Sequence, residues 1–324
     1  MKVSVKVPAT SANIGPGFDC LGLALPIYNT ITIEEKKIQG SGNEISVLVN
    51  NKNIDEASLS QIPTDENSIA YKSVEMLYSL TGQVPTDLKI TIETNIPIAR
   101  GMGSSASVIV GSLMAANALL SNPADEAAIL SIATEVEKHP DNIVPAVVGG
   151  LVASSVEDDG SVFYHKLEWP EDWHITLCIP DFELQTEIAR SVLPKEVPMQ
   201  DATFNSMRLA MFMEAVRNKD TELMKYALHD RIHQPYRMKL LPAFEAIQQS
   251  MKELDNVMGC VLSGAGPTIL IISHGNNIDE IKQRVRDCWD AVNINGEIVT
   301  TRVEHEGAKL LDVHSEQTSS PQIV

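Results

Sequence analysis

Basic residues are scarce in this sequence of 324 amino acids, in which 25 Lys and Arg stand against 43 Asp and Glu and the formal net charge is −18. So acidic a surface repels phosphate backbones and anionic headgroups, which argues against a nucleic-acid or anionic-membrane binder. It leaves room for a local basic pocket that holds a phosphate-bearing small molecule.

Cysteine is also scarce and shows no metal or redox spacing. The four cysteines, Cys20, Cys178, Cys260 and Cys288, are scattered, and none belongs to a Cys-x-x-Cys motif. We therefore expect a reduced, cytoplasmic setting and no disulfide framework. The N-terminal residues Met-Lys-Val-Ser-Val-Lys-Val alternate in polarity as a strand does, and they do not resemble a signal peptide.

Long repeats, low-complexity segments and coiled-coil heptads are missing as well. The uncharged segment 101–124 contains Gly, Ser and Asn throughout, so we expect a buried helix there and no transmembrane span. With 44% hydrophobic residues the chain can bury a substantial core. A polar turn at 157–160 marks the predicted boundary between a first domain, 1–155, and a second domain, 156–324.

Alternating apolar and polar residues predict strands, and 3.6-residue periodicity predicts helices. Residues 8–19 are predicted to form a structured loop, because they are rich in Gly and Pro. An apolar strand is expected after Asn142. The methionines of the predicted helix 203–218 are expected to lie in the core. The mixture excludes an all-α fold. Strands are predicted over 2–7, 28–35, 44–49, 88–94, 162–167, 174–179 and 298–303, and helices over 69–80, from Ser104 or Ser105 onward, and over 125–138, 203–218 and 276–289.

A glycine-rich loop stands between the strand 88–94 and the uncharged helix. Gly101 and Gly103 allow positive φ and close approach to a ligand, and the following helix N-terminus favours an anion. The loop lacks the Lys-Ser/Thr of a Walker A motif. The residues alone leave two interpretations open: a phosphate-binding loop, or a tight turn capped by serine.

The pattern Pro97-x-x-x-Gly101-Met-Gly103-Ser-Ser-Ala106 in this loop resembles the ATP loop of the GHMP small-molecule kinases. The run Pro8-x-Thr-Ser-Ala-Asn13-Ile-Gly-x-Gly-Phe-Asp19 is similar to that of the homoserine kinases within this superfamily, as are His139-Pro-Asp-Asn142 and Thr186-x-x-x-Arg190-x-x-Leu-Pro. The segments around Arg237 and Ser263-Gly264-Ala-Gly266 match later family motifs. Together the motifs span residues 3–268.

The resemblance implies a two-domain α+β fold, with an N-terminal domain like ribosomal protein S5 and a C-terminal ferredoxin-like domain. It also implies ATP- and Mg²⁺-dependent phosphorylation of the side-chain hydroxyl of L-homoserine in threonine biosynthesis, by a homodimer. The implied ATP contacts are Asn67, Pro97, Ile98, Ala99, Arg100, Gly101, Met102, Gly103, Ser104, Ser105, Ala106 and Ser107.

The remaining site residues follow from the same motifs. Ser105 and Glu135 are expected to hold Mg²⁺, and Asp141 or Asn142 to aim the acceptor hydroxyl. No strong general base is expected, because Thr10 stands where many GHMP kinases carry a lysine that supports an aspartate base. The implied substrate contacts are Asn13, Asp19, His139, Thr186, Arg190, Arg237 and Gly264, with the two arginines clamping the substrate carboxylate.

Simpler roles stay open for several of these side chains. Asn13 and Asp19 satisfy local backbone groups in many turns, Asn67 or Ser68 can cap the helix 69–80, and Asp141 can cap the turn that follows it. Two other functions are also open. One is a GHMP kinase for mevalonate or a sugar, and the other is an inactive relative that senses an amino acid.

Overall fold

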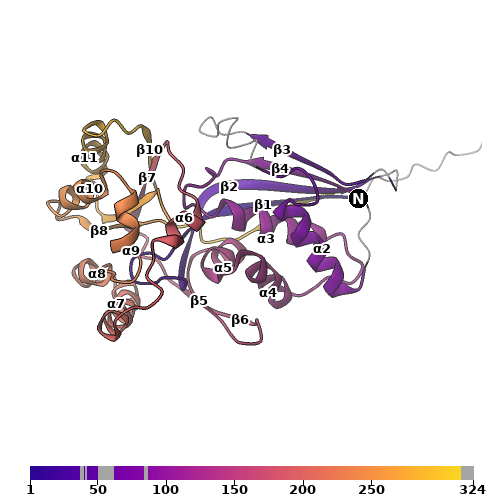
Figure 1. Cartoon of the computed structure of the whole chain (residues 1–324), viewed down its shortest axis with the longest axis horizontal. Coiled ribbons are helices and arrows are strands. Elements are labelled where there is room, and N and C mark those ends of the chain that lie inside the picture. The colour runs from indigo at the N-terminus through magenta and orange to yellow at the C-terminus, as the bar shows by residue number, and fades with distance from the viewer. Residues whose placement is uncertain (37–39, 41, 50–61, 84–86, 315–324) are drawn as a thin grey trace, which may run out of the picture.

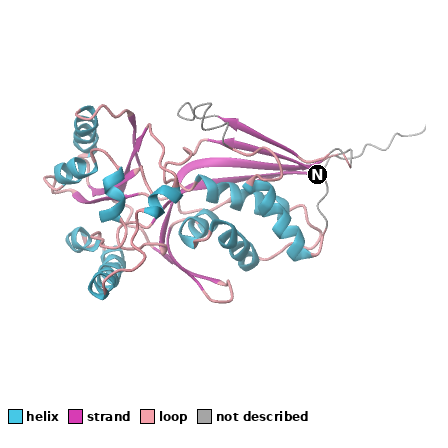
Figure 2. Ribbon diagram, viewed as in Figure 1, coloured by secondary structure: helices cyan, strands magenta, loops and turns pink. Residues whose placement is uncertain are grey.

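The computed structural model describes residues 1–36, 40, 42–49, 62–83 and 87–314. It contains two β-sheets, each with its own helices, joined end to end (Figures 1 and 2). The predicted α+β class is confirmed.

The larger sheet has seven strands in the order β11-β1-β2-β4-β3, with β5 paired to β2 and β6 paired to β5. Helices α2 (Ile69–Thr81), α3 (Ser104–Asn117), α4 (Glu126–Glu137) and α5 (Pro140–Val148) lie together on one side of it (Figure 1). Its strands are β1 (Lys2–Ala12), β2 (Leu21–Glu35), β3 (Glu44–Val49), β4 (Leu88–Thr94), β5 (Leu151–Val156), β6 (Val162–Leu167) and β11 (Lys309–His314).

Helix α3 is uncharged because it is the central helix of this half. It contacts β1 and β2 on one side and α2, α4 and α5 on the others. Ile109, Val110 and Leu113 are fully buried in one cluster with Val3, Val5 and Ile31. A helix enclosed in this way has no solvated face that would accommodate charge.

The smaller sheet has the strand order β10-β7-β9-β8 and is apolar on both faces. One face of β7 (Trp173–Pro180) and β9 (Ile269–His274) packs on α10 (Phe244–Met251) and α11 (Ile278–Asp290). The other face packs on α7 (Met199–Asn218), α8 (Thr221–Ala227) and the first half of β2. The remaining elements are β8 (Val257–Leu262), β10 (Gly296–Thr301), the short helices α6 (Thr186–Ser191) and α9 (Gln234–Arg237), and a 3-10 turn, Met238–Leu240.

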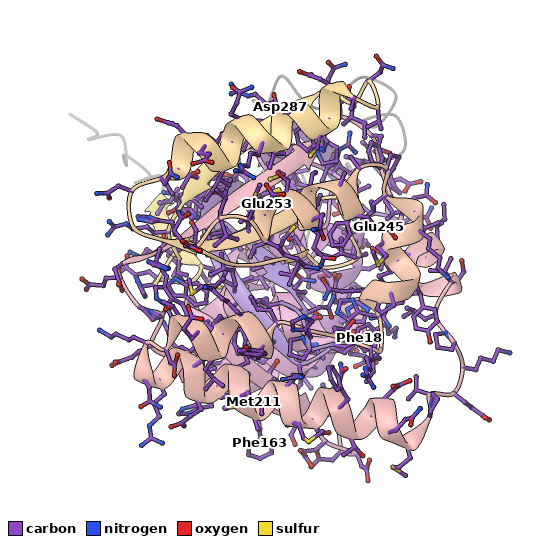
Figure 3. All side chains as sticks on the ribbon, turned by 90° about the vertical axis from the view of Figure 1, so that its left-hand side faces the viewer. Phe18, Phe163, Met211, Glu245, Glu253 and Asp287 are labelled. Carbon is purple, nitrogen blue, oxygen red and sulfur yellow. The ribbon has the colours of Figure 1, made fainter. Side chains whose placement is uncertain are left out.

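Three predictions of local structure were wrong. Residues 8–12 are strand, because β1 continues beyond an irregularity at Pro8/Ala9 and pairs with β2 as far as Ala12 and Gly22. Residues 143–148 are helix, because Pro140 at the first helical position begins α5. Met207 and Met211 lie on the solvent side of α7 (Met211 is labelled in Figure 3), since the helix packs through Phe212, Ala215 and Val216.

The domain division at residue 155 stays a prediction. By sheet membership the first half extends through β6 to Leu167, and β11 returns to it near the end of the described chain. None of the described helices combines the length and the apolar character that a membrane span requires.

A glycine on β2 fixes the distance between the sheet and α5. A Cβ on Gly22 would lie 1.7 Å from the carbonyl oxygen of Asp141, in the first turn of that helix. We predict that Gly22→Ala lowers the free energy of unfolding by roughly 2 to 3 kcal/mol, because a backbone group cannot rotate away.

Gly259→Ala on β8 is the matched control. Its Cβ would meet the Cδ1 end of Leu228 at 2.3 Å, which can rotate away, and the next nearest atoms of that side chain lie at 3.3 and 3.4 Å. Urea unfolding of both variants measures the difference. Equal losses in the two variants would contradict the prediction.

Candidate active site

A polar cavity of about 120 Å³ lies where the two halves meet. The glycine loop, the loop after β1, the start of α5, α6, α9 and the β8–β9 turn all contribute to its walls. Its lining residues are Ala12, Asn13, Asp19, Pro97, Ala99, Arg100, Gly101, Met102, Gly103, Ser104, Ser105, Glu137, His139, Asp141, Asn142, Thr186, Arg190, Arg237, Gly264 and Ala265.

The glycine loop has no room for side chains at its two glycines. Gly101 and Gly103 have φ values of 70° and 66°, and a Cβ on Gly101 would lie 2.2 Å from the carbonyl oxygen of Ser263. Gly103 is the N-cap of α3 and offers no side-chain cap. The first N–H groups of α3 are therefore available to an anion in the cavity.

A second hollow of about 410 Å³ adjoins the cavity and shares Ala99, Ser104, Ser105 and Thr186 with it. Its walls are largely apolar and include Ile98. Asn67 also lines it, whereas Ser68 provides the cap of α2 by accepting a hydrogen bond from the N–H of Ala70. Ser68 therefore caps the helix, and the side chain of Asn67 remains a candidate contact for a ligand.

The carboxylate in the cavity belongs to Glu137 and not to Glu135. Two residues on a helix point about 200° apart, so only one of them faces inward. Glu135 is exposed, while Glu137 lines the cavity and accepts a 2.8 Å hydrogen bond from Ser105 Oγ. Burial raises the pKa of Glu137 to about 7, against the opposing effects of Ser105 and Arg190.

The first turn of α5 brings His139, Asp141 and Asn142 to the cavity. Asp141 is 2% exposed, and its pKa is raised to about 7 by burial and by the negative charges of Asp19 and Glu137. Burial and the nearby Arg190 lower the pKa of His139, whose Nδ1 is buried with no hydrogen-bond partner among the described residues. Its neutral form therefore has an unused polar atom next to the cavity.

Asp19 and Arg190 form an ion pair across the cavity. Nη2 and Nη1 of Arg190 donate to the two carboxylate oxygens over 2.7 and 3.3 Å. The third donor, Nε, is buried and has no partner in the part of the chain that the structure describes. Both side chains are about one-third exposed, at 35% and 36%, so a ligand can reach the pair.

Arg237 is held much more firmly than Arg190. Its Nε donates to the carbonyl oxygen of Ala189, and Nη1 lies within hydrogen-bond distance of the carbonyl of Gly264 and of Nδ1 of His233, which leaves Nη2 for a ligand. Burial lowers its pKa to about 10. Phe18, labelled in Figure 3, stacks on His233 and lies 5.3 Å from the Arg237 guanidinium carbon.

Several residues of the implied site also make contacts that stabilise the fold. The guanidinium of Arg100 donates to the carbonyl oxygens of Ile98, Pro180 and Asp181, and thereby ties the glycine loop to the end of β7. Ala106 and Ser107 are fully buried below the loop.

The side chain of Asn13 fits the local-backbone alternative, because its amide bonds the carbonyl of Gly264 and the N–H of Asp19. Sequence reasoning passed over Glu137 in favour of Glu135. The one signal in the sequence that favoured Glu137 was its position two residues before His139, the start of a family motif.

Comparison with known proteins identifies the family of this chain. The GHMP kinases N-terminal domain family matches residues 68–150, and the GHMP kinases C-terminal family matches residues 212–291. The homoserine kinase of Microchaete diplosiphon is 36% identical over 310 residues, which cover 96% of this chain and 97% of that protein. The homoserine kinase of Halothermothrix orenii is 36% identical over 94% of both chains.

A solved structure shares the same fold. The crystal structure of homoserine kinase from Cytophaga hutchinsonii superposes with a TM-score of 0.84, at 27% identity, over 96% of this chain and 97% of that one. The two-domain arrangement expected from the motifs is confirmed. This chain belongs to the GHMP kinase superfamily, in the homoserine kinase family.

Proposed function

We propose that this protein transfers the γ-phosphoryl group of ATP to the side-chain hydroxyl of L-homoserine, which yields O-phospho-L-homoserine for threonine biosynthesis. The observation that carries the proposal is the Asp19–Arg190 pair, with Arg237 beside it, in the same small cavity as the glycine loop. An α-amino acid carries an ammonium and a carboxylate, and this cavity presents the Asp19 carboxylate for the first and two guanidinium groups for the second.

The nucleotide is assigned to the glycine loop and the adjoining hollow. The N–H groups at the start of α3 suit the phosphates, and the apolar hollow lined by Ile98 suits the base. Asn67, one of the implied ATP contacts, lines the same hollow and could contact the base. The shared wall of the two cavities brings the phosphates next to the acceptor.

The residues present fit a magnesium ion. Ser105 Oγ and the Glu137 carboxylate meet at 2.8 Å and supply hard oxygen ligands. No cluster of three or more metal-ligating side chains exists among the described residues, which agrees with an ion that takes most of its ligands from phosphates and water. When bound, Mg²⁺ neutralises charge on the β- and γ-phosphate oxygens. We therefore assign it to Ser105 and Glu137, not to Glu135.

The acceptor is assigned to the charged wall of the cavity. Asp19 would bind the ammonium group, and Arg190 would turn to the carboxylate and gain a partner for its buried Nε. Arg237 would add a single donor, Nη2, because its other donors are committed to protein atoms. The substrate carboxylate would therefore accept paired hydrogen bonds from the guanidinium of Arg190 and only one from Arg237. A clamp of two paired arginines, as the motifs implied, is not part of this proposal.

Positioning accounts for the phosphoryl transfer itself. The transition state is loose and develops little need for a strong base, so alignment and charge neutralisation supply most of the acceleration. Asn142 lines the cavity next to the glycine loop and would aim the hydroxyl. Asp141 is buried, and with its pKa near 7 it is only partly ionised at neutral pH.

We predict turnover with L-homoserine and MgATP, and no turnover with D-homoserine, L-threonine, L-serine or mevalonate. The measurement is ADP release, with phosphorus NMR of the product. Turnover of mevalonate would replace the proposal with a different GHMP kinase. Nucleotide binding without turnover of any acceptor would leave the amino-acid sensor. Light scattering of the same sample tests the homodimer that the resemblance implies.

We predict that Glu137→Gln lowers kcat by about a hundredfold at low Mg²⁺, because the metal loses its only protein carboxylate. Glu135→Gln is the matched control on the same helix and is expected to stay within twofold of the unmodified protein, since Glu135 is exposed. Titration of kcat against Mg²⁺ measures both, and excess Mg²⁺ should partly restore the first variant. The reverse ranking of the two variants would restore Glu135 as the ligand.

We predict that Asp141→Asn retains at least a tenth of kcat, which places a ceiling of about 1.4 kcal/mol on any role as a base. The same variant should be more stable than the unmodified protein without ligand. The buried carboxyl has a folded-state pKa of about 7, above its ordinary value, so its ionised form destabilises the fold.

The gain in the free energy of unfolding of Asp141→Asn is absent below about pH 4 and grows between pH 4 and 7. Above pH 7 it is constant at roughly 1 to 4 kcal/mol. Urea unfolding at pH 4, 6 and 8 measures it. Asp159→Asn, on an exposed turn where bonds from Ser161 lower the pKa of the carboxyl, should show no gain at pH 8. A loss of kcat above a thousandfold with unchanged KM would identify Asp141 as a base.

A further inference from the structure

Thr10 is a fully buried hydroxyl that the proposed mechanism does not use. It lies near the end of β1, opposite Ala24 of β2, and 0% of it is exposed. Its Oγ1 donates a 2.7 Å hydrogen bond to Oδ1 of Asn142, a residue 132 positions later in the chain. Its backbone N–H donates to the carbonyl oxygen of Met102 over 3.1 Å.

These two bonds connect Thr10 to both sides of the cavity. Met102 belongs to the glycine loop, and Asn142 belongs to the first turn of α5. A Cβ on Gly103 would lie 1.9 Å from Thr10 Oγ1 and 3.1 Å from Asn142 Oδ1, so the loop backbone passes directly over the hydrogen bond. The position of the loop and the position of the amide are therefore set by the same residue.

Two neighbours orient the amide, the Thr10 hydroxyl at Oδ1 and the Asp141 carboxylate near Nδ2. A threonine hydroxyl donates one hydrogen, and in this bond Asn142 accepts it through Oδ1. The Nδ2 group of Asn142 is then the end left to the cavity. It has only a 3.5 Å contact, to Oδ1 of Asp141, at the outer limit of a hydrogen bond. Asn142 therefore presents the N–H donors of Nδ2 to a ligand.

We propose that Thr10 is a positioning residue for phosphoryl transfer: it holds the Asn142 amide with Nδ2 toward the acceptor hydroxyl and locks that amide to the glycine loop. The inference rests on the proposed function. A displacement near 1 Å of an aligned group costs about a hundredfold in rate, so an amide that is free to rotate is poorly placed for catalysis. The effect belongs to kcat, because Thr10 itself contacts neither substrate.

The test compares Thr10→Val, Thr10→Ser and Thr176→Val. Valine removes the hydroxyl at nearly constant shape, and serine retains it. Thr176 is an equally buried strand threonine with one side-chain hydrogen bond, to Thr300, in the other sheet. We expect Thr10→Val to lower kcat ten- to thirtyfold with both KM values within threefold. Thr10→Ser should keep at least a third of kcat, and Thr176→Val should keep nearly all of it.

A double-mutant cycle with Asn142→Ala separates positioning from a general loss of packing. If Thr10 acts through the amide, then Thr10→Val lowers kcat by less than twofold once Asn142 is alanine. An equal loss in both backgrounds would overturn the proposal. So would a Thr10→Val protein that is folded by circular dichroism and keeps more than half of kcat, or one whose loss lies in KM.

The outcome is independent of the identity of the acceptor. The kcat and KM of every variant are compared with those of the unmodified protein, on whichever acceptor the unmodified protein phosphorylates. If that acceptor is not L-homoserine, the proposed function fails, and the Thr10 comparison is still made. If no acceptor is turned over, the thermal shift of Thr10→Val and Asn142→Ala proteins with ATP is measured, and unequal shifts would contradict a lock between loop and amide.

Discussion

The hydrogen bond from Ser263 Oγ to the carbonyl oxygen of Gly101, at 2.7 Å, joins the two halves of the molecule at the glycine loop. The contact depends on the absence of a side chain at Gly101, where a Cβ would lie 2.2 Å from a backbone oxygen. Arg100 strengthens the junction, since its guanidinium bonds carbonyl oxygens at the end of β7. The loop is therefore shaped by the second half of the chain as much as by its own sequence.

This junction explains why buried charge collects there. The charge of Asp141 is disfavoured by burial and by its acidic neighbours. Nδ1 of His139 and Nε of Arg190 are buried without a hydrogen-bond partner among the described residues. Such groups destabilise a folded protein, commonly by 1 to 3 kcal/mol each for a lost hydrogen bond. In a kinase site the ligands supply the missing partners, and a rigid frame of two sheets prevents the cavity from collapsing around its own polar atoms.

Sequence reasoning predicted the parts of this structure that depend on local pattern. The strand 88–94, the start of α3 and the strand 162–167 follow from periodicity and glycine placement, and they appear as expected. It failed where tertiary contacts decide. Residues 8–12 are strand because β2 extends alongside them, and residues 143–148 are helix because Pro140 starts a turn that β1 and β2 then cover.

The same limit applies to the site. Glu135 and Glu137 differ by two positions, and only the packing of α4 against α3 and α5 decides which carboxylate turns inward. Arg100 stands at a variable position inside the glycine-loop motif, and its hydrogen bonds depend on where β7 ends, which no local pattern encodes. Asn13, Asp19 and Arg190 belong to long motifs, and the structure brings all three to the lining of one cavity. Their contacts with one another could not be read from the sequence.

Under the proposed function, the Asp19–Arg190 pair accounts for selection of a doubly charged acceptor. With both side chains about one-third exposed, the pair contributes only about 1 kcal/mol or less, so opening it costs little. A zwitterion that enters the cavity gives each partner a new opposite charge. An acceptor with a single charge, or none, leaves Asp19 or Arg190 unpaired beside the buried Asp141 and Arg237. The selectivity then arises from the cost of an unpaired charge on Asp19 or Arg190 when the wrong acceptor binds. The strength of the Asp19–Arg190 ion pair itself contributes little to it.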